Sequence, residues 1–123
     1  MGKTILLDVD YDVRDHIFHM TIGRPRSNVT NLDLVNMGID DPLTAVTLDK
    51  STREVVGWIV HDFPETNNRL LPLSLLSGSP AIELHYRGGR VFAKLNGKLI
   101  FDICLCPGQQ DVKVLDWSAL DAG

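Results

Sequence analysis

The chain has 123 residues, 44% of them hydrophobic, which suits one domain (1–123) with an apolar core and not comfortably two. Its 12 basic and 16 acidic residues give a net charge of −4, which argues against the broad basic surface that binding to a nucleic-acid backbone needs. No signal peptide and no membrane-spanning apolar run is visible. We therefore expect a cytoplasmic protein that binds neither nucleic acid nor membrane.

The first predicted element is a hairpin of Lys3–Tyr11 and His16–Ile22, in which apolar and other residues alternate with the period of a strand. A turn at 12–15 places six apolar side chains on one face. The predicted pairs are Val9 with Phe18, Leu7 with Met20 and Ile5 with Ile22.

The same pattern puts the run Asp8-x-Asp10-x-Asp12 on the outer face of the first strand. Such a run begins like a calcium-binding loop, which requires glycine at its sixth position and glutamate at its twelfth. Val13 and His19 occupy those positions here. The run therefore favours a solvated strand face and turn.

A second hairpin is predicted from Leu43–Leu48 and Glu54–Val60. Both runs are apolar on both faces, which is typical of central strands. Gly57 inside the second run indicates a bulge or the close approach of a neighbouring strand. Asn31–Ile39 is ambiguous between an edge strand and a short turn of helix.

The leucine-rich segment that follows predicts one short helix at about Pro72–Ser77, because leucine favours helices and proline is tolerated in the first helical turn. Gly78 is a plausible end of this helix.

The last third predicts a meander, because Gly88-Gly89 is a two-residue hairpin turn. This turn pairs Tyr86 with Val91, Leu84 with Ala93, Ile82 with Leu95 and Glu83 with Lys94.

Asn96-Gly97 is a second hairpin signal with two possible registers. A two-residue turn would bury Asp102 without a partner, which costs several kcal/mol. We favour a three-residue bulged loop, which places Leu99 and Phe101 on the inner face. Val112–Trp117 adds a possible last strand.

The predicted fold is mostly β, with seven to eight antiparallel strands in hairpins and a meander, and one short helix near 72–77. A barrel-like closure and a two-layer sandwich both fit this pattern.

Candidate ligand-binding residues are few. The predicted register sets Asp8 opposite His19, and a carboxylate beside an imidazole is the start of an acid–base pair or a ligand site. His61 follows a buried strand and could join them. Arg24 and Arg26, in the loop after the first hairpin, could hold a small anion.

Cys104 and Cys106 lie on one face of a strand, too close for an ordinary structural disulfide and too few for a zinc site. A reducing compartment fits them, and core or near-surface thiols are the favoured interpretation. A Cys–His nucleophile with His85 stays open. We expect no cofactor and no stoichiometric metal ion.

Two segments resemble a family of small bacterial β-rich domains of unknown function. The segments are Tyr11-Asp12-Val13-Arg14-Asp15-His16-Ile17-Phe18 and, further on, Thr47-Leu48-Asp49-Lys50 with Val55-Val56-Gly57-Trp58-Ile59. The resemblance covers about residues 5–63 and departs from the family in the spacing of the first aspartates. The resemblance implies two hairpins. It implies no activity for this chain, because the family has no established activity.

No motif predicts catalysis, so the expected function is a non-enzymatic binding or protein-interaction module, as a homodimer or as an accessory partner of another small protein. The dimer is expected to bury Phe92 or Trp117. The alternative is a small-ligand-binding protein or enzyme that uses the Asp/His cluster in a sheet-lined pocket. If these side chains are scattered on a convex face, they support the interaction module; if they converge in one deep pocket, they support the alternative.

Overall fold

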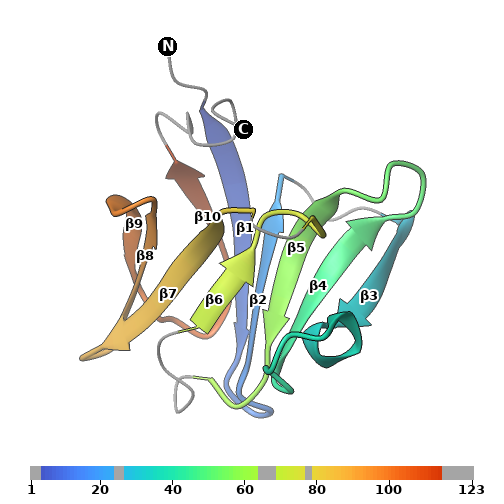
Figure 1. Cartoon of the computed structure of the whole chain (residues 1–123). Helices are drawn as coiled ribbons and strands as arrows, with labels where there is room; N and C mark the ends of the chain where they lie inside the picture. The colour runs from blue at the N-terminus through green and yellow to red at the C-terminus, as the bar shows by residue number, and fades with distance from the viewer. Residues whose placement is uncertain (1–3, 24–26, 64–68, 77–78, 115–123) are drawn as a thin grey trace.

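The computed structural model describes residues 4–23, 27–63, 69–76 and 79–114, which form ten strands in two antiparallel sheets (Figure 1). The larger sheet has the order β10 (Gly108–Val114), β1 (Ile5–Asp12), β2 (Ile17–Ile22), β5 (Val55–Val60), β4 (Thr44–Asp49) and β3 (Val29–Asp33). The smaller sheet has the order β6 (Arg69–Pro72), β7 (Ala81–Arg87), β8 (Arg90–Leu95) and β9 (Lys98–Cys104).

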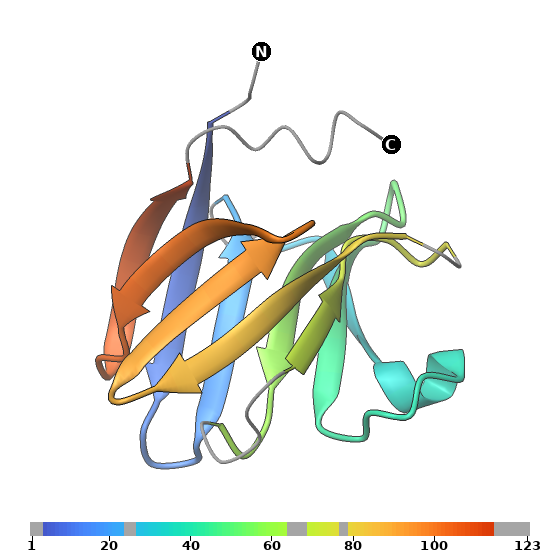
Figure 2. The ribbon, with the colours of Figure 1, turned by 60° about the vertical axis from the view of Figure 1, so that its left-hand side comes forward.

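The sheets lie face to face, and the strands of the smaller sheet cross those of the larger one obliquely (Figure 2). The prediction of a mostly β, antiparallel protein is confirmed, and the arrangement is two layers rather than a closed barrel. The structure has more strands than the predicted seven to eight, because short edge strands such as β3 and β6 are too brief to show a clear alternation.

The core lies between the two sheets. Most of its side chains come from the inner faces of the two sheets, since each strand turns alternate residues inward, and together with a few neighbours they form one buried cluster. The largest of them are Trp58, Phe18, Phe63, Leu7, Met20, Leu71, Ile82 and Leu84.

The first hairpin has the predicted inner face but a different register. Tyr11 pairs with Phe18 and Asp10 pairs with His19, two residues away from the predicted pairing. A shift of two residues leaves every side chain on its own face, so the inward set is the same. The correction matters for the outer face, because His19 lies opposite Asp10 and not opposite Asp8.

A tight turn at 13–16 sets this register. The Asp12 carboxylate accepts hydrogen bonds from the backbone N–H groups of Arg14 and Asp15, at 2.9 and 3.2 Å. Aspartate favours such turns because its side chain reaches its own backbone two or three residues on. As a result β1 extends to Asp12 and pairs with β2 along its whole second half.

The prediction that β4 and β5 are central strands is confirmed, since β5 lies between β2 and β4 and most residues of both strands are buried. The register shifts after Thr47, which pairs with Gly57, and leaves Val56 as an extra residue in β5. A Cβ atom on Gly57 would lie 2.9 Å from the carbonyl oxygen of Met20. Both a bulge and a close approach therefore occur at this glycine.

The meander is confirmed in register. Across the Gly88-Gly89 turn, Tyr86 pairs with Val91 and Glu83 pairs with Lys94. Both glycines have positive φ, 57° and 82°, as a two-residue hairpin turn of this kind requires.

The next turn corrects the prediction of a three-residue loop. Leu95 pairs with Lys98, so only Asn96 and Gly97 form the turn. Their φ values of 53° and 80° match a type I′ turn, whose twist suits two adjacent strands.

A bulge within β9 then restores the inner face. Lys94 pairs with Leu99, but Ala93 pairs with Phe101, so one residue of β9 is skipped. Phe101 is therefore buried, as predicted, and Asp102 stays exposed. Leu99 was expected to face inward and is instead 52% exposed.

The predicted helix at 72–77 is wrong where the structure describes it, and Ser77 lies outside the described residues. The chain forms strand β6 up to Pro72 and then bends through 73–76. Leu70 is 60% exposed and Leu71 is fully buried, which is the alternation of a strand. Trp58 Nε1 donates a hydrogen bond of 2.7 Å to the Pro72 carbonyl oxygen and thereby ties the two sheets together.

The helical element in the described part of the chain is η1, one turn of 3-10 helix at Leu34–Met37. It follows β3 directly, so both alternatives for Asn31–Ile39 occur, one after the other. Gly38 ends the turn with φ of 80°. No described helix has the length and apolar character to cross a membrane.

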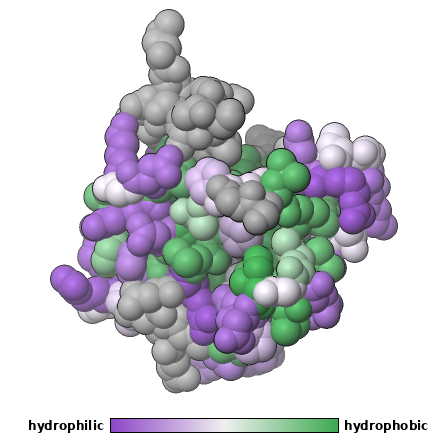
Figure 3. Space-filling view, viewed as in Figure 1, coloured by the Kyte–Doolittle hydropathy of each residue, from purple (hydrophilic) through white to green (hydrophobic). Residues whose placement is uncertain are grey.

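Apolar side chains gather on the face of the molecule seen in Figure 1, around β6 and the chain after it (Figure 3). Leu70 and Leu76 are 60% and 77% exposed. Met37 and Ile39 line a hollow together with Leu76, so part of the η1 region belongs to the same apolar surface. Such a contiguous surface is a candidate contact area for a partner.

Candidate functional site

A row of side chains crosses the outer face of the six-stranded sheet. Asp10 pairs with His19, His19 with Ile59, Ile59 with Ala45, and Ala45 with Asp33. Paired residues of neighbouring strands project to the same side of a sheet. The register therefore places a carboxylate near each end of this row and an imidazole and two apolar groups between them.

The row lies in a depression of about 420 Å³ on this face. Ala45, the smallest side chain of the row, is only 3% exposed because larger neighbours surround it. A volume of this size is within the range of small-ligand sites. The residues that line the depression are Asp10, Asp12, Ile17, His19, Asn31, Asp33, Ala45, Ile59 and His61.

The charges of the depression are mostly negative. Asp10 and Asp33 have no cationic partner among the described residues, whose ion pairs join Arg69 to Asp41 and Arg90 to Asp102. Asp33 precedes η1 without making a side-chain cap. Two exposed carboxylates are thus available to an external cation.

Hydrogen bonds within the chain hold the side chains of Asp12 and Asn31 and the backbone of His61. Asp12 is fixed by its turn, as described above. Asn31 Oδ1 accepts a hydrogen bond of 3.0 Å from the Thr47 hydroxyl, which orients the amide on β3. His61 directly follows β5, and its backbone N–H donates to the Leu43 carbonyl oxygen at 2.8 Å.

The structure brings together two of the five predicted ligand-binding residues, His19 and His61. Asp8 is not part of the depression. It lies opposite Thr21, is 8% exposed, and accepts a hydrogen bond of 2.6 Å from Gln109 Nε2. Arg24 and Arg26 lie outside the described residues.

Sequence reasoning missed the contribution of β3. Asn31 and Asp33 are polar residues two positions apart, and this spacing is the only signal that they share a strand face. Asp10 and Asp12 were expected on the outer face but not in a site. Within the described ranges, no three His, Cys, Asp or Glu side chains have an arrangement that could hold a metal ion.

Comparison of the chain with family models, curated proteins and solved structures finds no match. The function must therefore be inferred from the residues of the site.

Proposed function

We propose that the protein is a non-catalytic binding module, and that the outer-face depression receives a lysine or arginine side chain of a partner protein. The main support is the row from Asp10 to Asp33, which holds a carboxylate near each end and, between them, the His19 imidazole and the apolar side chains of Ile59 and Ala45. A long cationic side chain matches this pattern, because its methylene stem packs on apolar groups while its charged end meets a carboxylate.

The shape of the site also favours binding over catalysis. The carboxylates come from β1 and β3, at the two sides of a broad depression, rather than from one enclosed point. Catalytic acids and bases act within hydrogen-bonding distance of one reacting group.

A second candidate function is the binding of a free small amine instead of a side chain of a partner protein. The volume of about 420 Å³ supports it.

Replacing Asp10 and Asp33 together with asparagine is expected to weaken binding of a lysine- and arginine-rich nonapeptide by about 2- to 30-fold, since each exposed ion pair contributes about 0.2–1 kcal/mol. Isothermal titration calorimetry at low salt measures the affinity, which should also fall as salt is added. The variant Asp15→Asn/Asp40→Asn is the matched control, because it removes the same charge from exposed positions outside the depression.

Equal losses in both variants would show that net charge alone attracts the peptide and would contradict the proposed site. No binding by the wild-type protein would contradict the function. Arginine amide in place of the peptide separates the two candidates, because a small-amine site binds it as tightly as the peptide.

We also propose a homodimer, with light scattering at tens of micromolar expected to give twice the chain mass of 13.7 kDa. Phe92 is half-buried on the outward side of β8, where its ring stacks on His85 at 5.0 Å between ring centroids. Trp117, the other predicted contact, lies outside the described residues. A mass of 13.7 kDa would contradict the dimer, and a dimer that leaves Phe92 as exposed as in the monomer would contradict this surface.

A further inference from the structure

The two cysteines of the chain are both exposed, at the point where β9 ends. Between them, Leu105 turns the other way and packs against the core. The Leu105 N–H donates a hydrogen bond of 2.9 Å to the Gly89 carbonyl oxygen, so this residue is fixed to the β7–β8 turn. The anchored leucine holds Cys104 and Cys106 on the outward side of the chain, as neighbours two positions apart.

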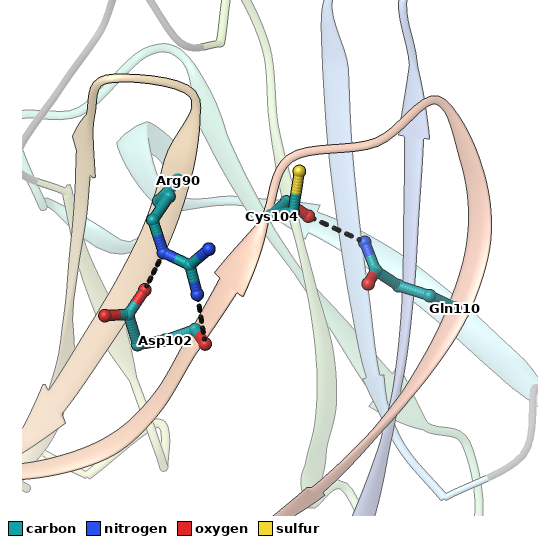
Figure 4. Close-up of polar contacts among 4 residues, drawn as sticks. All are labelled: Arg90, Asp102, Cys104 and Gln110. Carbon is teal, nitrogen blue, oxygen red and sulfur yellow. Dashed lines mark hydrogen bonds and ion pairs between the residues drawn. The ribbon is translucent and has the colours of Figure 1, made fainter.

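A second contact fixes the segment from its other side. Gln110 Nε2, from β10, donates to the Cys104 carbonyl oxygen at 3.2 Å. Figure 4 shows this contact and the sulfur of Cys104 pointing away from Gln110. The backbone of Cys104 is therefore held by its neighbours while its thiol is left accessible.

The two thiols interact with each other. The Cys106 thiol makes a side-chain hydrogen bond with the Cys104 thiol, so the two sulfurs lie next to each other at the surface. One cation can therefore contact both sulfurs at once.

The neighbouring strand places an ion pair beside Cys104. Arg90 of β8 pairs in register with Cys104, and its guanidinium binds the Asp102 carboxylate at 2.8 Å (Figure 4). This guanidinium is about half exposed and lies on the same side of the sheet edge as the Cys104 side chain. It would face any anionic complex formed at the thiols.

We propose that Cys104 and Cys106 form a two-thiol site that chelates one soft cation of the Cu(I) class. Thiolates are the ligands that such ions prefer. Both S–H bonds break, two protons go to solvent, and both sulfurs bind the ion, whose oxidation state does not change. The product carries one negative charge, and it lies beside the Arg90–Asp102 ion pair. The proposal departs from the sequence-based expectation of no metal ion, because that expectation considered sites of three or more ligands and a two-thiol chelate needs only two.

The test is an anaerobic titration of the reduced wild-type protein with Cu(I) in competition with a chromophoric Cu(I) chelator. The expected result is one ion per chain. The variants Cys104→Ser and Cys106→Ser should each bind Cu(I) at least about 100-fold more weakly than the wild-type protein, because the second thiol of a chelate acts at a high effective concentration. Both positions are exposed, so far-UV circular dichroism should show unchanged folding in the variants.

Affinities of the single-thiol variants within about tenfold of wild type would overturn the proposal, because the second thiol would then add too little for a chelate. Two ions per chain would overturn it as well, because each thiol would then act alone. One ion shared by two chains would replace the chelate by an intermolecular bridge, and sedimentation of the loaded protein distinguishes that case.

Discussion

Replacing Trp58 with alanine is expected to lower the free energy of unfolding by about 3–5 kcal/mol, the range for truncating a large aromatic side chain in a core. Trp58 is fully buried, on the inner face of β5. Its indole N–H also donates the 2.7 Å hydrogen bond to the Pro72 carbonyl oxygen, on the other sheet. The substitution therefore leaves a cavity and removes a polar link between the sheets.

The variant Trp58→Phe separates these two effects. It keeps most of the apolar volume and removes the donor, so the expected loss is smaller, about 1–3 kcal/mol. Urea unfolding followed by far-UV circular dichroism measures each value. Val13→Ala is the exposed control, with an expected change of no more than about 0.5 kcal/mol because Val13 is 55% exposed. A loss below about 1 kcal/mol for Trp58→Ala would contradict the central place of this side chain in the core.

Local turn chemistry explains which parts of the fold could be predicted from the sequence. Gly88-Gly89 fixes the β7–β8 register, because only one turn type joins two strands through two residues of positive φ. The first hairpin lacks such a pair, and its four-residue turn at 13–16 depends on hydrogen bonds that the Asp12 carboxylate accepts from the backbone. The face of each side chain was predictable there, whereas the partner of each residue was not.

The segment around Pro72 shows how tertiary contacts override local preference. Its leucines favour a helix when they are considered alone. In the folded chain β6 instead pairs with β7, Leu71 fills the core, and the Pro72 carbonyl oxygen meets Trp58, which is 14 positions earlier. None of these contacts is visible in a local pattern.

The candidate site depends on the same long-range pairing. His19 was predictable as a polar group on the outer face of its strand and His61 as a residue that follows a buried strand, but the pairing of β2 with β5 that brings them together was not. Asp33 joins them only because β3 pairs with β4 and β4 with β5. The pairing of β10 with β1 likewise explains Asp8, whose carboxylate is bound by Gln109, 101 positions later. Such contacts require the topology of the whole sheet.

Replacing Gly57 with alanine is expected to destabilise the protein by about 1–3 kcal/mol, the usual cost of forcing an extra group into a well-packed site. The new Cβ would lie 2.9 Å from the Met20 carbonyl oxygen, a backbone atom that moves only if β2 moves. The sign of the effect is informative, because the same change at an unstrained position stabilises by about 0.4–1 kcal/mol through the unfolded chain.

The double variant Thr21→Ala/Gly57→Ala identifies which neighbouring atom causes the loss of stability in Gly57→Ala. Thr21 Oγ1 would lie 3.3 Å from the new Cβ, a milder contact than the one with the Met20 oxygen. If the backbone oxygen dominates, removing the hydroxyl recovers little of the lost stability in a double-mutant cycle. Full recovery would assign the cost to the Thr21 side chain, and a more stable Gly57→Ala protein would show that β2 yields at this point. If β2 moves in the Gly57→Ala protein, His19 moves with it, because β2 also carries His19. Binding in the outer-face depression should then weaken as well.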